Sequence, residues 1–354
     1  MNLKDKIMLV VFLTSVFLLN INTARGEATE LSVEELETVA QSMRAVEDAL
    51  LNVRIDSNSW VEEGPSSSGP WERTPVCWST TAYYGKISSN QARIDVHKSV
   101  LPWENGAAPY LQKSYSVSFD GEQVRRKEIS SSFSGKTFDI DTAVIFPKAS
   151  ALAQLRGFGR ITGVEASLFF HYCGMPEPLP ERFSANFEAI ADPNYFLSAL
   201  ATADPNYSNI KPLAAKVVLE ELRGIQCIKM VVMADSAPTA WWLDPNRGFA
   251  LLRIENWRVD QDGNERLKSS INVTKLEEVA ENIWWPMEMS TVSKSHEAGK
   301  PWRRFVYRAS NVVANDPNFD DSIFTVPFPE GYRISDEVTG RTYIVGQDPN
   351  NPDE

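Results

Sequence analysis

The chain has 354 residues, of which 43% are hydrophobic and 23% charged, an ordinary composition for a globular protein. Its formal net charge of −12 argues against nucleic acid and anionic membrane surfaces as partners, because both select for basic patches. Three widely spaced cysteines, Cys77, Cys173 and Cys227, exclude a disulfide framework and match no cysteine metal motif.

Residues 1–26 have the pattern of a secretory signal peptide. Lys4 and Lys6 precede an apolar run over Ile7–Leu19, and Ala24-Arg25-Gly26 places small residues at the −3 and −1 positions of a cleavage site. The apolar run is shorter than the roughly 20 residues that a membrane span needs. We therefore expect an exported protein of the periplasm or cell envelope that is soluble after cleavage, with an uncleaved anchor as the alternative.

A long helix is predicted over Glu30–Val53. Ser32 and Glu35 have the spacing of a capping box, in which each side chain accepts the other residue's backbone N–H. The apolar residues that follow recur at helical spacing; they are Leu36, Val39, Met43, Val46 and Leu50. Because the opposite face is acidic, the helix is expected to lie on a sheet.

The segment after the helix, Ser57–Thr74, contains EEGPSSSGP and is predicted to be a flexible loop. Strands are then predicted around Val76–Tyr84, Gln91–Val100, Gln112–Phe119 and Gln123–Ser131. Two short helices are predicted in the middle of the chain, at Ala149–Phe158 and Asn194–Ala203.

From Ala214 the pattern is that of an antiparallel meander. Strands are predicted over Val217–Glu221, Ile225–Met233, Arg266–Leu276, Ile283–Ser293 and Trp302–Val313, in addition to a hairpin over Thr239–Trp257. Phe324–Gln347 is expected to add one or two edge segments, and residues 348–354 are expected to be disordered.

The hairpin over Thr239–Trp257 is the clearest local prediction. Its turn, Asp244–Gly248, has Asp first, Pro second and Gly where φ must be positive. Strict alternation places Ala250, Leu252 and Ile254 on one apolar face of the second strand. Leu251, Arg253 and Glu255 then lie on the opposite, mixed face.

Aromatic and methionine side chains gather on a later strand. Along Ile283–Lys294, alternation puts Trp285, Met287 and Met289 on one face. Because methionine repacks around varied shapes, such a face would suit an apolar ligand. The alternative is that these side chains simply fill the core.

Few residues suggest catalysis. The three histidines are His97, His171 and His296, and His171 with Cys173 would point to one face of a strand. No second His/Cys pair and no nucleophile elbow accompanies them, so we predict no catalytic residue, no metal site and no cofactor.

Several segments occur together with the signal peptide, long helix and meander: SFDGEQ (Ser118–Gln123), WWLDPNRGFALLRIE (Trp241–Glu255) and IWWPMEM (Ile283–Met289). This combination resembles exported proteins of the LolA/LolB lipoprotein-carrier and RseB-type envelope-sensor superfamily. The closing segments Phe324–Glu337 and Gly340–Gly346 are similar to the ending of members from planctomycete-type bacteria. The resemblance implies an unclosed β-barrel whose concave apolar face is covered by helices and, in the carriers, holds lipoprotein acyl chains.

The sequence thus predicts an α+β fold: a strongly curved antiparallel sheet, an unclosed half-barrel, with helices over its concave face. A single domain is expected over 27–347, with insertions near 57–74 and 146–206. The first functional hypothesis is non-enzymatic binding of lipid, lipoprotein acyl chains or another apolar molecule in a cavity of roughly several hundred Å³. The predicted ligand face comprises Ala250, Leu252, Ile254, Trp285, Met287 and Met289.

Two alternatives remain open at this stage. The chain could be an envelope sensor or scaffold that contacts another protein through an apolar patch near Pro176–Pro205, with its sheet face filled by its own side chains. An exported hydrolase would instead need His97 or His171 beside a carboxylate or hydroxyl in a cleft.

Overall fold

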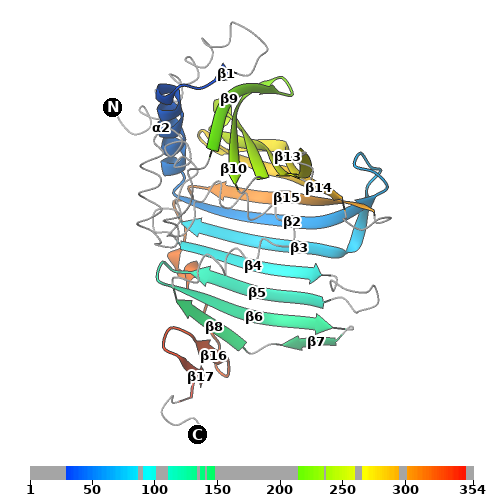
Figure 1. Ribbon diagram of the computed structural model, residues 1–354. Coiled ribbons are helices and arrows are strands. Elements are labelled where there is room, and N and C mark those ends of the chain that lie inside the picture. Colours follow the sequence, from blue (N-terminus) through cyan, green and yellow to red (C-terminus); the bar gives the residue numbers. More distant parts are fainter. Residues whose placement is uncertain are drawn as a thin grey trace. The chain divides into compact units, whose positions relative to one another are not determined.

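The computed structural model describes residues 29–86, 91–100, 111–133, 136–139, 142–147, 214–234, 237–259, 265–294 and 301–347. These residues are mostly antiparallel strand and contain one α-helix, which is too short and too polar to cross a membrane (Figure 1). Contacts group the chain into two compact units, where the sequence predicts a single domain. Unit 1 comprises Met1–Leu50 and Ser167–Trp302, and unit 2 comprises Leu51–Ala166 and Arg303–Glu354.

Several predicted features lie outside the described residues, and they stay predictions. They are the signal peptide, the helices at Ala149–Phe158 and Asn194–Ala203, the apolar patch near Pro176–Pro205, His171, Cys173, His296 and the tail 348–354.

The predicted N-terminal helix is present as α2, Val33–Ala49, in unit 1. Its capping box forms, because Ser32 Oγ accepts the Glu35 N–H at 3.3 Å and Glu35 Oε2 accepts the Ser32 N–H at 2.6 Å. The helix ends at Ala49 rather than Val53, since Leu50 is extended and a strand begins at Asn52.

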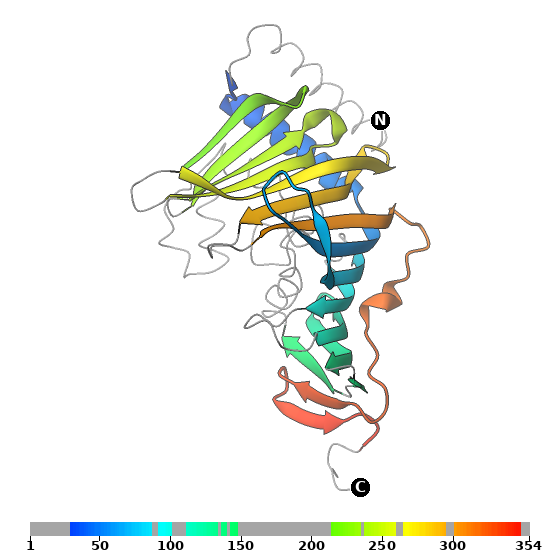
Figure 2. The same cartoon turned by 90° about the vertical axis from the view of Figure 1, so that its right-hand side faces the viewer.

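The strands of unit 1 form the predicted meander. They are β1 (Thr29–Glu30), β9 (Ala214–Leu222), β10 (Ile225–Ala234), β11 (Ala237–Asp244), β12 (Ala250–Val259), β13 (Glu265–Ala280) and β14 (Ile283–Lys294). From β9 to β14 each strand pairs antiparallel with the next, and β1 pairs with β9. Helix α2 runs alongside this sheet (Figure 2).

Two turns of this meander use left-handed backbone, as the sequence indicates. Arg223 and Gly224 both have positive φ in the two-residue turn between β9 and β10. The turn after β11 is a 3₁₀ helix, η5 (Pro245–Arg247), whose first N–H is accepted by Asp244 and which ends at Gly248 with φ of 58°. The residues of these two turns therefore determine which residues of β9 and β10, and of β11 and β12, lie opposite each other.

Unit 2 is a second antiparallel array. Its strands are β2 (Asn52–Gly64), β3 (Glu72–Lys86), β4 (Gln91–Val100), β5 (Leu111–Phe119), β6 (Gln123–Phe133), β7 (Lys136–Asp139), β8 (Thr142–Pro147), β15 (Trp302–Ala314, which enters the unit at Arg303), β16 (Arg333–Asp336) and β17 (Arg341–Ile344). The predicted flexible loop over 57–74 is wrong, because β2 and β3 continue the ladder through most of it. The alternating burial of Val53, Ile55, Ser57, Ser59 and Val61 shows why a strand forms there.

The C-terminal segment is tied to the sheet of unit 2 by more than edge pairing. A short 3₁₀ helix, η6 (Asp321–Phe324), places the Ile323 carbonyl where Arg93 Nη1 donates to it at 3.0 Å, and Phe324 is buried beside it. Further on, β16 pairs in parallel with β8 and antiparallel with β17. The sequence predicts one or two edge segments here. The strand β16 is instead an internal strand, because it is paired on both sides.

The mostly antiparallel character of the predicted sheet is confirmed within each unit, with the β16–β8 pair as a parallel exception. A cover of several helices over a concave face stays a prediction, because α2 is the one α-helix among the described residues.

Gly248 gives a test of the turn that ends η5. A Cβ at this position would lie 2.3 Å from the Asn282 carbonyl oxygen, in addition to the strain of positive φ. We expect Gly248→Ala to lower the free energy of unfolding in urea by roughly 2 kcal/mol or more. Gly224→Ala is the matched control, since its φ is also positive but a Cβ there meets nothing within 4 Å. Equal losses in both variants would contradict the predicted clash.

Candidate functional site

The candidate site is one apolar side of the sheet in unit 1, called here the Met–Trp face. It is defined by Met230, Ile254, Ile271, Trp285, Met287 and Met289, all of them buried. The ladder register puts Met230 opposite Trp241, Trp241 opposite Ile254 and Ile254 opposite Ile271. Because residues directly opposite each other in an antiparallel pair share a face, these rows cross from β10 to β13 on one side.

The strand β14 completes this face as the sequence predicts. Met289 lies opposite Val273, and alternation carries Met287 and Trp285 to the same side. Trp285 and Met289 are each only 1% exposed, whereas their neighbours Trp284 and Glu288 are half-buried. The burial of all three side chains agrees with the predicted grouping of Trp285, Met287 and Met289, and their role as a ligand face stays a prediction.

The predicted grouping of Ala250, Leu252 and Ile254 is wrong. The register shifts between Trp242 and Leu243, so that Trp242 lies opposite Arg253 whereas Leu243 lies opposite Leu251. Leu252 is the extra residue of this β-bulge and packs with Trp242 on the other side of the sheet. The bulge also places Ala250 opposite Asp244, on the side away from Ile254.

Helix α2 meets the sheet at a small pocket near the start of β12 and β14. Met43, Val46 and Leu50 of the helix line it together with Phe249, and Ile283 and Trp284 complete its wall. Its volume is about 30 Å³, which has room for no more than a few water molecules. This is far below the cavity of several hundred Å³ predicted for a lipid binder, so that cavity stays a prediction.

The opposite side of the same sheet carries a charged cluster around a buried tryptophan. Glu220 accepts hydrogen bonds from Lys229 Nζ at 2.8 Å and from Trp242 Nε1 at 3.1 Å. The Lys229 ammonium lies 4.8 Å from the Trp242 ring centroid and the Arg253 guanidinium 5.3 Å from it, both in the range of cation–π contacts. Arg253 also forms an ion pair with Glu255.

The electrostatics of this cluster are balanced. Burial raises the pKa of Glu220, but the hydrogen bonds from Lys229 and Trp242 outweigh it and leave this pKa below its ordinary value. The cluster contains two cations, Lys229 and Arg253, and two carboxylates, Glu220 and Glu255. Their charges balance, so these four groups present no surplus charge to a ligand. Its physical role is to cover Trp242 and the apolar side chains beneath it.

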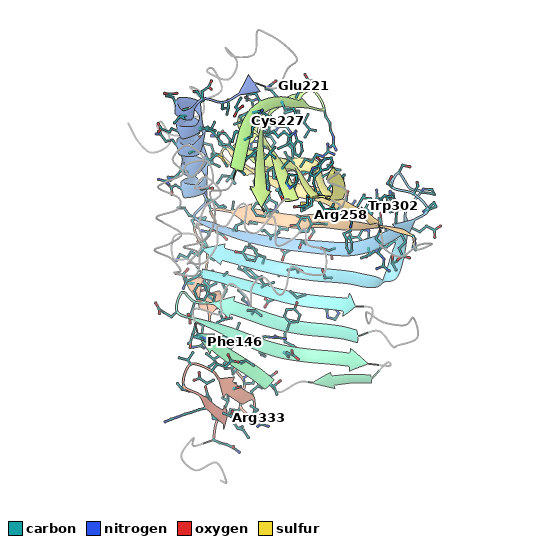
Figure 3. All side chains as sticks on the ribbon, viewed as in Figure 1. Phe146, Glu221, Cys227, Arg258, Trp302 and Arg333 are labelled. Atoms are coloured by element: carbon teal, nitrogen blue, oxygen red, sulfur yellow. The ribbon has the colours of Figure 1, made fainter. Side chains whose placement is uncertain are left out.

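Cys227 lies under the same cluster and is free. Its sulfur donates to the Ile225 carbonyl oxygen at 3.2 Å, and burial raises the thiol pKa to about 12. A thiol with this pKa is protonated at neutral pH and is a poor nucleophile. Figure 3 labels Cys227 beside Glu221 on the neighbouring strand.

Sequence reasoning missed the partners of Trp242, although one signal pointed to them. The two-residue turn at Arg223-Gly224 fixes the register of β9 against β10, which puts Glu220 opposite Cys227 and Val218 opposite Lys229. Alternation from that register would have placed Glu220 and Lys229 on one side of the sheet.

Of the three histidine candidates, His97 is the one that lies within the described residues. His97 Nδ1 lies 2.6 Å from Ser114 Oγ, in directly opposite positions of β4 and β5, but His97 is exposed rather than set in a cleft. Within the described ranges, no three His, Cys, Asp or Glu side chains are grouped so that they could hold a metal.

Comparison with known proteins gives two remote likenesses. The first is a putative outer membrane lipoprotein-sorting protein domain from Vibrio parahaemolyticus, with 10% identity and a TM-score of 0.38 over 83% of this chain and 97% of that one. The second is a β-barrel-like protein of domain of unknown function DUF1849 from Brucella abortus, with 9% identity and a TM-score of 0.21 over 75% of this chain and 99% of that one. No family model and no curated protein matches the sequence. Both TM-scores are below 0.5, so neither likeness assigns a function.

The lowered pKa of Glu220 predicts how unit 1 responds to acid. A carboxyl group whose pKa falls on folding stabilises the protein above its unfolded pKa, near 4.5, and this stabilisation is lost as pH falls through the lower folded value. We expect Glu220→Gln to lower the melting temperature at pH 7 and to flatten the decline in stability below about pH 4.5. Glu221→Gln is the control, because Glu221 is exposed on the adjacent position. A thermal-melt series in which both variants follow the wild-type pH dependence would contradict this assignment.

Proposed function

We propose that the mature protein is an exported, non-enzymatic binder of an apolar ligand, such as a lipid or a lipoprotein acyl chain. The single observation that carries this proposal is the Met–Trp face of unit 1. It supplies contiguous apolar rows across β10 to β14, with methionine at three of the six defining positions. Methionine side chains adjust to ligands of differing shape better than branched side chains do.

Ligand entry is proposed at the end where α2 meets the sheet. Met43 and Leu50 of α2 border the pocket there, and its far wall includes Ile283, which alternation places on the same side as Trp285. An acyl chain needs a volume on the order of ten times the 30 Å³ pocket. Binding therefore requires α2 to move away from Phe249 and Ile283, so that the pocket extends along the Met–Trp face.

One observation favours a second candidate function. Trp285 and Met289 are already almost fully buried by other atoms of the chain. A face filled in this way suits a scaffold or envelope sensor that acts through protein contacts, with the methionines serving as ordinary core. The two candidates differ in whether the Met–Trp face binds an apolar ligand or is filled by the protein's own side chains.

The test of binding uses the mature protein purified after export. Native mass spectrometry with lipid extraction should show acyl lipid that travels with the protein. A titration with fluorescently labelled hexadecanoic acid should then show saturable binding that unlabelled lipid displaces. A clean apo mass together with no saturable signal would favour the scaffold.

Met287 and Glu288 provide a matched pair for locating the ligand. A Met287→Gln change puts an amide on the Met–Trp face, and we expect labelled hexadecanoic acid to bind about tenfold more weakly or worse. Glu288→Gln changes the adjacent side chain on the other side and should leave the dissociation constant within about twofold. Met287→Leu keeps the volume apolar and should retain binding. Equal effects of Met287→Gln and Glu288→Gln, in variants whose melts show them to be folded, would place the ligand elsewhere.

A further inference from the structure

One end of the unit 2 sheet carries a half-buried tryptophan, Trp60, in contact with two exposed arginines. Strand β2 pairs with β3 and with β15, so residues of all three strands meet around Trp60 (Figure 1). The Arg73 guanidinium lies 4.9 Å from the Trp60 ring centroid and the Arg308 guanidinium 5.5 Å from it, both in the range of cation–π contacts. Trp60, Arg73 and Arg308 are called here the Arg–Trp cluster.

A chain of contacts holds the Trp60 ring in place. Trp60 Nε1 donates to Glu62 Oε1 at 2.8 Å, and Arg304 Nε donates to Glu62 Oε2 at 2.7 Å. The Arg304 guanidinium in turn lies 5.0 Å from the Trp71 ring centroid. Trp71 packs closely against the hairpin backbone, because a Cβ on Gly64 would lie 3.0 Å from the Trp71 ring. A ring fixed in this way loses little conformational entropy when a partner binds to it.

The contacts around Trp60 carry a surplus of positive charge. They bring together one glutamate, Glu62, and three arginines, which are Arg73, Arg304 and Arg308. The row that continues from Trp60 across β3 and β4 consists of Trp78 and Ser99, which have no charge. The Arg–Trp cluster therefore differs from the balanced cluster around the tryptophan of unit 1.

The other acidic residues of this region have positions or partners of their own. Glu63 accepts a hydrogen bond from Arg303 Nε at 2.9 Å, and Glu72 lies opposite Glu63 in the ladder. Farther along β2, Asp56 forms an ion pair with Arg54. The positive surplus of the Arg–Trp cluster thus stands out in a chain whose net charge is −12.

We propose that the Arg–Trp cluster binds an extended acidic segment of a partner protein. Arg73 and Arg308 would each donate paired hydrogen bonds to a carboxylate, and the exposed part of the Trp60 ring would contact the aliphatic stems of the same segment. Tryptophan and arginine are also the residue types that most often dominate the binding energy of protein interfaces. This site lies within unit 2 and does not depend on the Met–Trp face of unit 1.

The size of the Arg–Trp cluster favours a short segment. Alternate side chains of an extended peptide lie about 6.5 Å apart, so two carboxylates separated by one residue suit two guanidiniums that share one ring. A broad anionic surface fits less well, because it would also face the negative net charge of the whole chain.

Two labelled peptides that differ only in charge test the proposal on the full mature protein. Fluorescence anisotropy is measured with the glutamate peptide GEVEVEG and with its glutamine analogue GQVQVQG. We expect the glutamate peptide to bind about tenfold more tightly, because hydrogen bonds to a charged acceptor are stronger than those to a neutral one. The preference should shrink as salt is added, since the arginines are exposed and their charges are screened.

Arginine substitutions locate the bound peptide. The double variant Arg73→Gln with Arg308→Gln should reduce the preference for the glutamate peptide to about one. The control is Arg54→Gln with Arg333→Gln, which removes the same charge from two other exposed arginines of unit 2 and should leave the preference within about twofold. Arg54 is a close match, because its guanidinium also lies over an aromatic ring, 5.5 Å from the Tyr84 centroid. Both double variants should melt close to the wild type, since they change exposed side chains.

The outcome is independent of apolar-ligand binding. The Arg73→Gln and Arg308→Gln variant should bind labelled hexadecanoic acid as the wild type does, whereas Met287→Gln should leave the peptide preference unchanged. Equal affinity for the two peptides, the absence of binding for both, or an equal loss of preference in the two double variants would overturn the proposal. Binding of phosphatidylglycerol vesicles that is lost in the Arg73→Gln and Arg308→Gln variant, without binding of the glutamate peptide, would assign the cluster to a lipid surface and would also overturn it.

Discussion

The pairing register of the antiparallel ladders is the constraint on which the rest of this structure depends. Because successive side chains of a strand point to opposite sides, a shift of one residue moves every following side chain to the other face. The bulge at Trp242 and Leu243 does this in β12. It sends Leu252 to the charged side of the sheet, and it leaves Ile254 in line with Trp241 and Ile271. This bulge thus decides which residues of β12 belong to the Met–Trp face.

The two sides of the unit 1 sheet bury their tryptophans by different physical means. Trp285 is covered on the apolar side, where the free energy comes from removing large apolar surfaces from water. Trp242 is covered by Lys229 and Arg253, whose alkyl stems and charged heads lie over the ring while Glu220 takes the indole N–H. The second arrangement needs every charge to be matched, whereas the first accepts substitution by other apolar groups. An adaptable ligand surface is therefore expected on the side of Trp285.

The sequence predicted elements whose cause is local. The capping box of Ser32 and Glu35 and the Asp244–Gly248 turn are set by neighbouring residues, and both form. Non-local causes escaped prediction. Ser57 and Ser59 have weak strand propensity, yet they lie in β2 because pairing with β3 satisfies their backbone groups. The parallel pairing of β16 with β8 joins segments far apart in the chain and leaves no local trace.

The candidate site shows the same division. Within β14, alternation places Trp285, Met287 and Met289 on one side, although the ladder with β13 shifts register at Met287. It failed for Ala250 and Leu252, because a bulge depends on how two strands fit together and not on either sequence alone. Ser79 and Thr81 of β3 illustrate the limit from the other direction. Serine and threonine in a strand look like solvent-facing residues in a sequence, and only the packed ladder shows that these two are buried. Buried polar side chains therefore become visible at the level of packing, because their burial depends on what the neighbouring strands place beside them.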